Sequence, residues 1–271
     1  MNFFADDKDY DFRVLSCNVR IFNVYEHLRD VDYRSSVEMM HWLRDNDADV
    51  ICLQEYYSNN SKLFRSKEVI SASYPYSYIE PFLVYENQIF GMAIFSKHPI
   101  VRVGSVRFKE KSNNQIIYSD IVVKKDTIRC YNIHLQSMSI DEKDILEGTI
   151  SKETGTKWLN VLIRYKRGSV MRSTQVEALI RHLQTCTYPS IVCGDLNEPP
   201  VGYAYEQISE LLPNCYEQTA TGFGTTYRGK LPFLRIDNIF AADELTPVDF
   251  KIHKEITYSD HYPISCGFKI K

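Results

Sequence analysis

Residues 190–200 read Ser-Ile-Val-Cys-Gly-Asp-Leu-Asn-Glu-Pro-Pro, and this stretch decides how the rest of the chain is interpreted. It begins as a short apolar run, which is typical of a buried strand. The run breaks at Gly194 and presents Asp195 and Asn197, and two prolines then stop the strand from continuing. A carboxylate there can take a proton from water or bind a hard cation, and an amide can offer oxygen to a metal or N–H to an oxyanion. The stretch therefore predicts a functional site where a buried strand reaches the surface.

Length and composition bound the class of protein. The chain has 271 residues, 44% of them hydrophobic, which allows a sizeable core in one large domain or two small ones. The formal net charge is −3 and the pI is about 6.2. Dedicated nucleic-acid binders usually carry a basic footprint, so a nucleic-acid partner is not favoured.

Five of the seven cysteines lie inside apolar, strand-like runs: Cys17, Cys52, Cys130, Cys193 and Cys266. They are interpreted as small buried side chains, since their spacings match neither a disulfide framework nor a zinc pattern. No stretch is long and apolar enough to span a membrane, and no secretory segment opens the chain. The polar run 1–9 leaves two expectations open, a fragment of a longer envelope protein or a cytoplasmic protein.

Apolar patterning predicts strands from one end of the chain to the other, with helices between some of them. The expected strands are 12–20, 49–55, one or two within 74–85 broken at Pro81, 90–96, 100–108, 115–123, 127–134, 190–194, 233–240, 248–253 and a last one ending at 268. The expected helices are 33–44, 61–71, 139–148, 158–165, 170–184 and 203–212. Hairpins mixed with helical crossovers argue against an all-parallel sheet and favour a β core flanked by helices in one domain, 1–271.

Polar groups stand at the ends of six of these strands or in the adjoining loops: Asn18, Glu55, His134, Asp195 with Asn197, Asp237, and Asp260 with His261. Carboxylate and amide oxygens predominate, thiolates are absent, and there are two imidazoles. Such a set suits Mg²⁺, Mn²⁺ or Ca²⁺ better than zinc. A hard cation beside His and Asp side chains suits attack on phosphorus, because the metal neutralises charge, a carboxylate activates water and the imidazoles stabilise the oxyanion.

The motifs around these residues, in chain order, are Ser-Cys-Asn-Val (16–19), Leu-Gln-Glu (53–55), Asn-Ile-His (132–134), Gly-Asp-Leu-Asn (194–197), Arg-Ile-Asp (235–237) and Ser-Asp-His (259–261). In this order they resemble the successive motifs of the endonuclease/exonuclease/phosphatase superfamily, the deoxyribonuclease-I-like fold, over about residues 12–268. The resemblance implies an α/β (α+β) four-layer sandwich, with two mixed β-sheets packed face to face and helices outside. It also implies a divalent-metal phosphoesterase site at one end of the sandwich.

The resemblance also implies roles for single residues. Glu55 would be the principal metal ligand, with Asn18 and Asp260 beside the ion, which is Mg²⁺ or alternatively Mn²⁺ or Ca²⁺. Asp195 would orient and deprotonate the attacking water, and Asn197 would hold the phosphate or that water.

Two imidazoles complete the implied site. His261, paired with Asp237, would contact the phosphoryl oxygen. His134 stands where apurinic-site nucleases use another side chain, which favours branches that include deoxyribonucleases, sphingomyelinases and sugar- or lipid-phosphate hydrolases. Glu86 is the nearest candidate for a carboxylate partner of His134. Asn238 departs from the aromatic residue that many relatives carry after the aspartate.

Two classes of function follow. The first is a metal-dependent hydrolase of phosphate esters, above all diesters, acting on nucleic acid or on a phospholipid or small molecule. The second is a non-catalytic binding member of the same fold. A member without activity is expected to have lost a charged group of the site, and none is missing here, which favours the enzyme. No obligate protein partner is implied, and a monomer is expected.

Substrate choice is expected to lie in loops around the rim of the sandwich. Two segments stand outside the motif strands, 137–172 and 223–230, and both combine aromatic residues with positive charge. The first contains Trp158 and the cluster Arg-Tyr-Lys-Arg at 164–167. We expect these segments to form one wall of the pocket; the alternative is that the helices only cover a sheet face.

Overall fold

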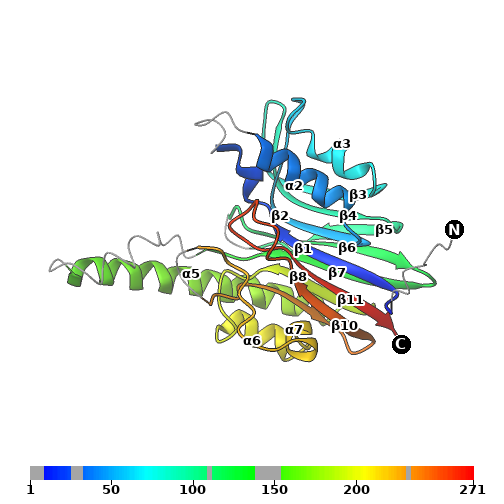
Figure 1. Cartoon of the computed structure of the whole chain (residues 1–271). Coiled ribbons are helices and arrows are strands. Elements are labelled where there is room, and N and C mark those ends of the chain that lie inside the picture. Colours follow the sequence, from blue (N-terminus) through cyan, green and yellow to red (C-terminus); the bar gives the residue numbers. More distant parts are fainter. Residues whose placement is uncertain (1–8, 26–32, 109–111, 138–153, 230–232) are drawn as a thin grey trace.

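The computed structural model describes residues 9–25, 33–108, 112–137, 154–229 and 233–271, with the backbone alone for 154–162. Its strands form two mixed sheets (Figure 1). The six-stranded sheet runs in the order β10 (Leu245–Ile252), β11 (Ile264–Ile270), β1 (Phe12–Asn18), β2 (Val50–Ser58), β4 (Gln88–Ser96) and β3 (Tyr76–Tyr85). The five-stranded sheet runs β5 (Ile100–Ser105), β6 (Gln115–Val123), β7 (Asp126–His134), β8 (Ser190–Asp195) and β9 (Asp237–Ala241).

The two sheets pack face to face because their central strands are apolar on both sides. Alternate residues of one strand point to opposite faces. In β1, Val14 enters the core between the sheets, whereas Leu15 enters the outer core of the six-stranded sheet. In β8, Ile191 enters the core between the sheets, and Val192 enters the outer core of the five-stranded sheet.

Helices cover the two outer faces (Figure 1). Those on the six-stranded sheet are α2 (Arg34–Asp45) and α3 (Ser66–Ser71), and those on the five-stranded sheet are α5 (Thr154–Leu183) and α6 (Tyr203–Ser209). The short helix α7 (Cys215–Thr219) packs against β9 and β10. The predicted α/β sandwich with two mixed sheets inside and helices outside is confirmed.

Several predicted element boundaries are wrong. The two helices predicted at 158–165 and 170–184 are one helix, α5, which ends at Leu183, because the cost of Gly168 inside it, about 1 kcal/mol, is too small to break it. The strand predicted from 233 begins at Asp237, since the preceding backbone bonds to loops instead of to a neighbouring strand. Pro81 does not divide β3, an edge strand that accommodates proline at a bulge.

Other boundaries differ by a few residues. The first strand ends at Asn18, followed by a turn, Arg20–Asn23, in which four consecutive residues have positive φ. The second strand continues past Glu55 to Ser58. Helix α3 starts at Ser66 and α6 ends at Ser209, so both are shorter than predicted, and α7 was not predicted. The helix predicted at 139–148 lies outside the described residues. Within the described part of the chain, none of the helices combines the length and apolar character of a transmembrane span.

The register of the strands brings the motif residues to one end of the sandwich, where several strands begin or finish. β1 and β2 are parallel with Asn18 opposite Gln54, and β7 and β8 are parallel with His134 opposite Asp195. β9 is antiparallel to β8, so its first residue, Asp237, also lies opposite Asp195. The last residues of three strands and the first of a fourth therefore meet at the same end.

Gly194 is expected to be indispensable to this register. Its φ is +141°, and a Cβ there would stand 2.0 Å from the carbonyl oxygen of Ile133 in β7. We expect Gly194→Ala to lower the free energy of unfolding by about 3 kcal/mol or more, since backbone strain and collision add. Urea unfolding measures this.

Gly222→Ala is the matched control, because Gly222 has φ +95° and its nearest neighbour atom would be 3.8 Å away, so only the strain remains. Equal losses in the two variants would contradict the role assigned to the close approach of β7 and β8.

Candidate active site

Asp195 lies at the centre of the cluster at this end. It ends β8 and is buried. Its Oδ1 accepts a hydrogen bond from the backbone N–H of Asn197 at 2.8 Å, and its Oδ2 accepts from Asn18 Nδ2 at 3.2 Å and Asn197 Nδ2 at 3.3 Å. Burial raises the pKa of Asp195 to about 6, with the charge of Asp237 adding to this and the nearby imidazoles opposing it. A carboxylate whose pKa lies close to neutrality is suited to accept a proton from water.

His261 and Asp237 form a buried ion pair beside it. His261 Nδ1 lies 2.9 Å from Asp237 Oδ2, and its Nε2 lies 3.8 Å from Asp195 Oδ2. Burial alone would lower the pKa of His261, but the charges of Asp237 and Asp195 outweigh it and raise the pKa to about 10. The predicted hydrogen bond between Asp237 and His261 is confirmed, and the imidazole is charged at neutral pH.

His134, the last residue of β7, faces the same centre. Its Nε2 lies 3.7 Å from Glu55 Oε1 and 3.8 Å from Asp195 Oδ2. In the described part of the chain, the carboxylates that pair with this imidazole are those two, and the candidate Glu86 is not among them. Glu86 belongs to the turn between β3 and β4, whereas the two true neighbours come from strands adjoining the site.

Glu55 is directed to the site by a β-bulge in β2. The pairing of β2 with β4 shifts register between Leu53 and Tyr56, and Glu55 has a φ of +50°. A bulge re-aims a side chain at the cost of local strain, and such strain is concentrated at functional sites. The Glu55 carboxylate accepts a hydrogen bond from Asn18 Nδ2 at 3.2 Å and is partly exposed.

Asn18 and Asp260 are placed differently from each other. The amide nitrogen of Asn18 bridges Glu55 and Asp195, and its oxygen accepts the backbone N–H of Arg20 at 3.0 Å. Asp260 stands at the rim, with its Oδ2 3.5 Å from Arg20 Nε. Asn18 is thus a hydrogen-bond bridge between carboxylates in this structure, and its role as a metal ligand stays a prediction.

The donor set fits a hard cation. Glu55 and Asp260 are partly exposed carboxylates at the edge of the cluster, and carboxylate oxygens are the ligands that Mg²⁺, Mn²⁺ and Ca²⁺ prefer. Among the described residues, the acidic group whose ligand atoms lie within 4.8 Å of one another is Asp195, Asp237 and His261. All three residues are buried. His261 is hydrogen-bonded to Asp237, and its Nε2 lies 3.8 Å from Asp195 Oδ2.

Two residues of the segment 223–230 lie next to the site, although the sequence assigned no role there to either of them individually. Thr226 Oγ1 accepts the backbone N–H groups of Ile236 and Asp237, both at 3.1 Å, and so sets the start of β9. Tyr227 forms an isolated bridge with His261, and their rings meet edge to face at 5.3 Å. A Thr-Tyr pair in a loop has no periodicity by which the sequence could have shown its position.

A buried polar network behind the site was also missed. Gln54 donates to Asn132 Oδ1 at 2.6 Å and to Ser16 Oγ at 3.1 Å. Asn132 in turn donates to the backbone oxygens of Leu53 and Ala93. The network joins β7 of one sheet to β1, β2 and β4 of the other, directly behind the polar strand ends.

Arg172 of α5 joins the two loops that leave the catalytic strands. It is only 1% exposed, its Nη1 donates to the backbone oxygen of Gln136 at 2.9 Å, and its Nε donates to Glu198 Oε2 at 3.0 Å. Gln136 follows His134, and Glu198 follows Asn197. Asn197 Nδ2 also donates to the backbone oxygen of Leu135 at 2.9 Å, so both loops are held together.

We expect Arg172→Met to destabilise the protein by about 3–5 kcal/mol, because it leaves the Glu198 carboxylate buried without a cationic partner. Chemical denaturation measures the loss. Adding Glu198→Gln should restore part of the stability, since glutamine keeps an oxygen for the α6 backbone N–H groups of Ala204 and Tyr205 but carries no charge. A double variant no more stable than Arg172→Met would contradict this explanation.

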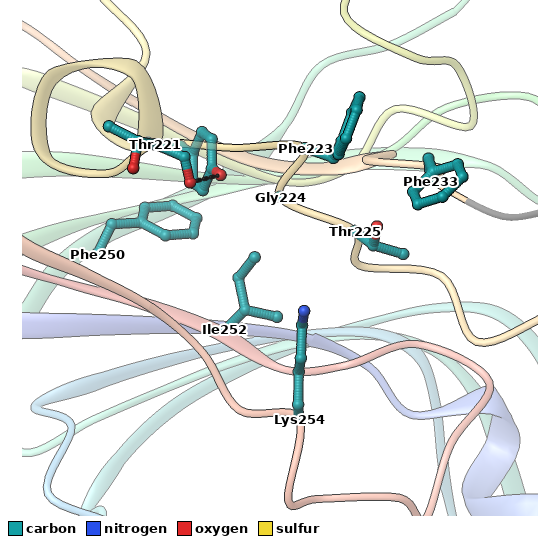
Figure 2. A pocket seen from close by; sticks show the side chains of 9 residues that line it. Thr221, Phe223, Gly224, Thr225, Phe233, Phe250, Ile252 and Lys254 are labelled. Atoms are coloured by element: carbon teal, nitrogen blue, oxygen red, sulfur yellow. Dashed lines mark hydrogen bonds between the residues drawn. The ribbon is translucent and has the colours of Figure 1, made fainter.

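A cavity of about 390 Å³ opens beside the loop that carries Thr226 and Tyr227. Figure 2 shows Phe223 and Phe233 on its rim, Phe250 and Ile252 of β10 as an apolar wall, and Lys254 extending toward Thr225. It contains none of the predicted catalytic residues. Of the two segments expected to form a pocket wall, 223–230 contributes to this lining and the described part of 137–172 does not. That these segments determine substrate preference stays a prediction.

The fold and the cluster together place the chain in the class of deoxyribonuclease-I-like sandwiches. The sequence profile of the Endonuclease/Exonuclease/phosphatase family matches residues 15–261, and the chain belongs to this family. A comparison with curated protein sequences gives no match.

Similar solved structures agree with the fold. One is an endonuclease/exonuclease/phosphatase from Beutenbergia cavernae, at 17% identity and a TM-score of 0.69, covering 96% of this chain and 71% of that one. Another is the human Nocturnin catalytic domain with bound sulfate, at 17% identity and a TM-score of 0.63, covering 96% and 93%. A third is a mannosyl-6-phosphatase from Bacteroides thetaiotaomicron, at 14% identity and a TM-score of 0.64, covering 95% and 99%. At these identities the likeness shows the fold alone.

Proposed function

We propose that this protein is a divalent-metal-dependent phosphodiesterase, within the phosphoester hydrolase activity that its family implies. The observation that carries the proposal is the buried cluster in which the Asp195 carboxylate faces the His261 imidazole and Asp237 holds that imidazole from its other side. Asp195 has a pKa of about 6 and His261 one of about 10, and the two lie 3.8 Å apart. The site thus places a carboxylate with a raised pKa beside an imidazole whose pKa the neighbouring carboxylates also raise, an arrangement suited to acid–base chemistry.

The residues would act as follows. Asp195 accepts the proton of the attacking water, whose position Asn197 helps to set. His261 directs Nε2 toward a phosphoryl oxygen, because Asp237 occupies its Nδ1. Positive charge placed where negative charge develops lowers the barrier of phosphoryl transfer.

Glu55 and Asp260, with Asn18 beside them, would hold the divalent cation. When bound, the ion would supply neutralising charge at the phosphate. His134 Nε2 lies 3.7 Å from Glu55 Oε1 and 3.8 Å from Asp195 Oδ2, and this imidazole would also steady the oxyanion. Burial of Asp195 and His261 keeps water from screening these charges.

The sulfate in the Nocturnin structure and the phosphatase name of the Bacteroides relative support a site for a tetrahedral anion in this fold. The decisive experiment is a panel of phosphodiester and phosphomonoester substrates with Mg²⁺, Mn²⁺ and Ca²⁺, with a chelator as control. Metal-dependent cleavage of diesters in preference to monoesters supports the proposal. Preference for monoesters would make the protein a phosphatase, and no turnover on any substrate would favour the binding member.

A further inference from the structure

Helix α5 continues beyond the body that it covers. Its C-terminal half packs on the five-stranded sheet through Val176, Leu179 and Leu183. Its N-terminal half projects past the end of the sandwich at which β1, β7 and β8 finish (Figure 1). Arg172 marks the transition, since it bonds to the loops that follow His134 and Asn197. Residues 163–170 therefore stand within about 14 Å of those loops along the helix axis.

The projecting part is basic and free of acidic residues. The sequence has four Lys or Arg residues and no Asp or Glu from 154 to 171, in a chain whose formal net charge is −3. Arg164, Lys166 and Arg167 are exposed in the structure. This segment of α5 is thus basic in a chain whose net charge is negative.

The outward face of this helix mixes basic and aliphatic side chains. Successive residues turn by 100°, so Ile163, Lys166, Arg167 and Val170 share the face opposite to the buried residues of α5. Ile163 is 55% exposed and Val170 is 56% exposed. Exposed aliphatic groups between basic ones are characteristic of helices that lie in a membrane interface.

Two exposed aromatic residues lie on another side of the same site. Phe223 and Phe233 are 74% and 62% exposed, and their rings contact each other at 4.9 Å (Figure 2). Their loop reaches the catalytic residues directly, because Arg228 N–H donates to the backbone oxygen of Asp260 at 2.7 Å. Apolar groups thus emerge from two segments that both border the active site.

We propose that the exposed residues of α5 at 163–170, together with Phe223 and Phe233, form a docking surface for an anionic lipid bilayer. Basic side chains near such a surface are attracted by its negative potential, and the aliphatic and aromatic groups enter the interface. Exposed aliphatic side chains gain nothing from a nucleic-acid backbone, which makes the bilayer the better complement of this mixed surface.

The test is co-sedimentation of the full chain with vesicles of pure phosphatidylcholine, or of phosphatidylcholine with about 30 mol % phosphatidylserine, in a chelator. Wild-type protein should bind the anionic vesicles alone and be released at about 0.5 M NaCl. The variant Arg164→Glu/Lys166→Glu/Arg167→Glu should lose binding by roughly 100-fold. The variant Phe223→Ser/Phe233→Ser should bind more weakly at every salt concentration.

The matched control reverses three exposed lysines elsewhere, Lys62→Glu/Lys67→Glu/Lys125→Glu, and should bind like wild type after both variants are shown to be folded by circular dichroism. Equal loss in the control, or full binding by the α5 variant, would overturn the proposal. So would α5-dependent binding of a labelled single-stranded RNA with unchanged vesicle binding. Asp195→Asn should bind vesicles normally, so failure here and failure of the proposed hydrolase activity are distinguishable.

Discussion

Replacement of Asp195 by asparagine is expected to lower turnover on the true substrate on the order of 10²–10⁴-fold, the usual cost of removing a general base. Asparagine retains the shape of the side chain but cannot accept a proton from water. Its amide oxygen can still accept the backbone N–H of Asn197, so the loop after β8 is expected to keep its conformation. Steady-state kinetics under saturating metal measure the effect.

Asp120→Asn is the matched control for this variant. Asp120 is also a buried aspartate of the five-stranded sheet, but it pairs with Arg129 at 2.6 Å and takes no part in the cluster. Its replacement should lower stability and leave turnover per folded molecule unchanged. Near-full activity of Asp195→Asn, or an equal rate loss in both variants, would remove Asp195 from the proposed role.

Replacement of Glu55 by glutamine is expected to weaken Mg²⁺ or Mn²⁺ binding by about 100-fold or more. Removal of a residue that hydrogen-bonds to a metal ligand typically lowers metal affinity about 10–100-fold. Loss of a charged residue that itself binds the metal should lower the affinity at least as much. The protein should remain folded, because Glu55 is partly exposed and glutamine can still accept the Asn18 hydrogen bond. Isothermal titration calorimetry with each ion measures the affinity.

Glu80→Gln, in edge strand β3 of the same sheet, provides the control and should bind metal like wild type. The outcome also separates the two candidate ion sites. Unchanged affinity in Glu55→Gln together with lost affinity in Asp237→Asn would assign the ion to Asp195, Asp237 and His261 instead. That result would contradict the proposed ligand set.

The sequence alone determined which residues could carry the chemistry. The apolar runs that stop at Gly194 or before His134 are visible within a short window of sequence. The same is true of the turn-forming residues that follow a buried strand. The order of the motifs along the chain resembles that of a known superfamily, and this resemblance was sufficient to predict a sandwich with a polar end. The prediction of two helices in place of α5 was wrong for the same reason, because only neighbouring residues were considered. A glycine next to a basic cluster resembles a helix break when the surface on which the helix packs is not known.

Only the tertiary structure decided how these residues meet. Asn18 bridges carboxylates 37 and 177 residues away, and such pairings depend on strand register, which no local pattern specifies. The bulge that turns Glu55 inward and the burial that raises the pKa of Asp195 arise from neighbouring strands. The same holds for Arg172, whose sequence context suggests a solvated helix but whose packing buries it between two catalytic loops. Contacts between distant segments set the geometry and electrostatics of the site, because burial and charge proximity exist only once the sheets have packed.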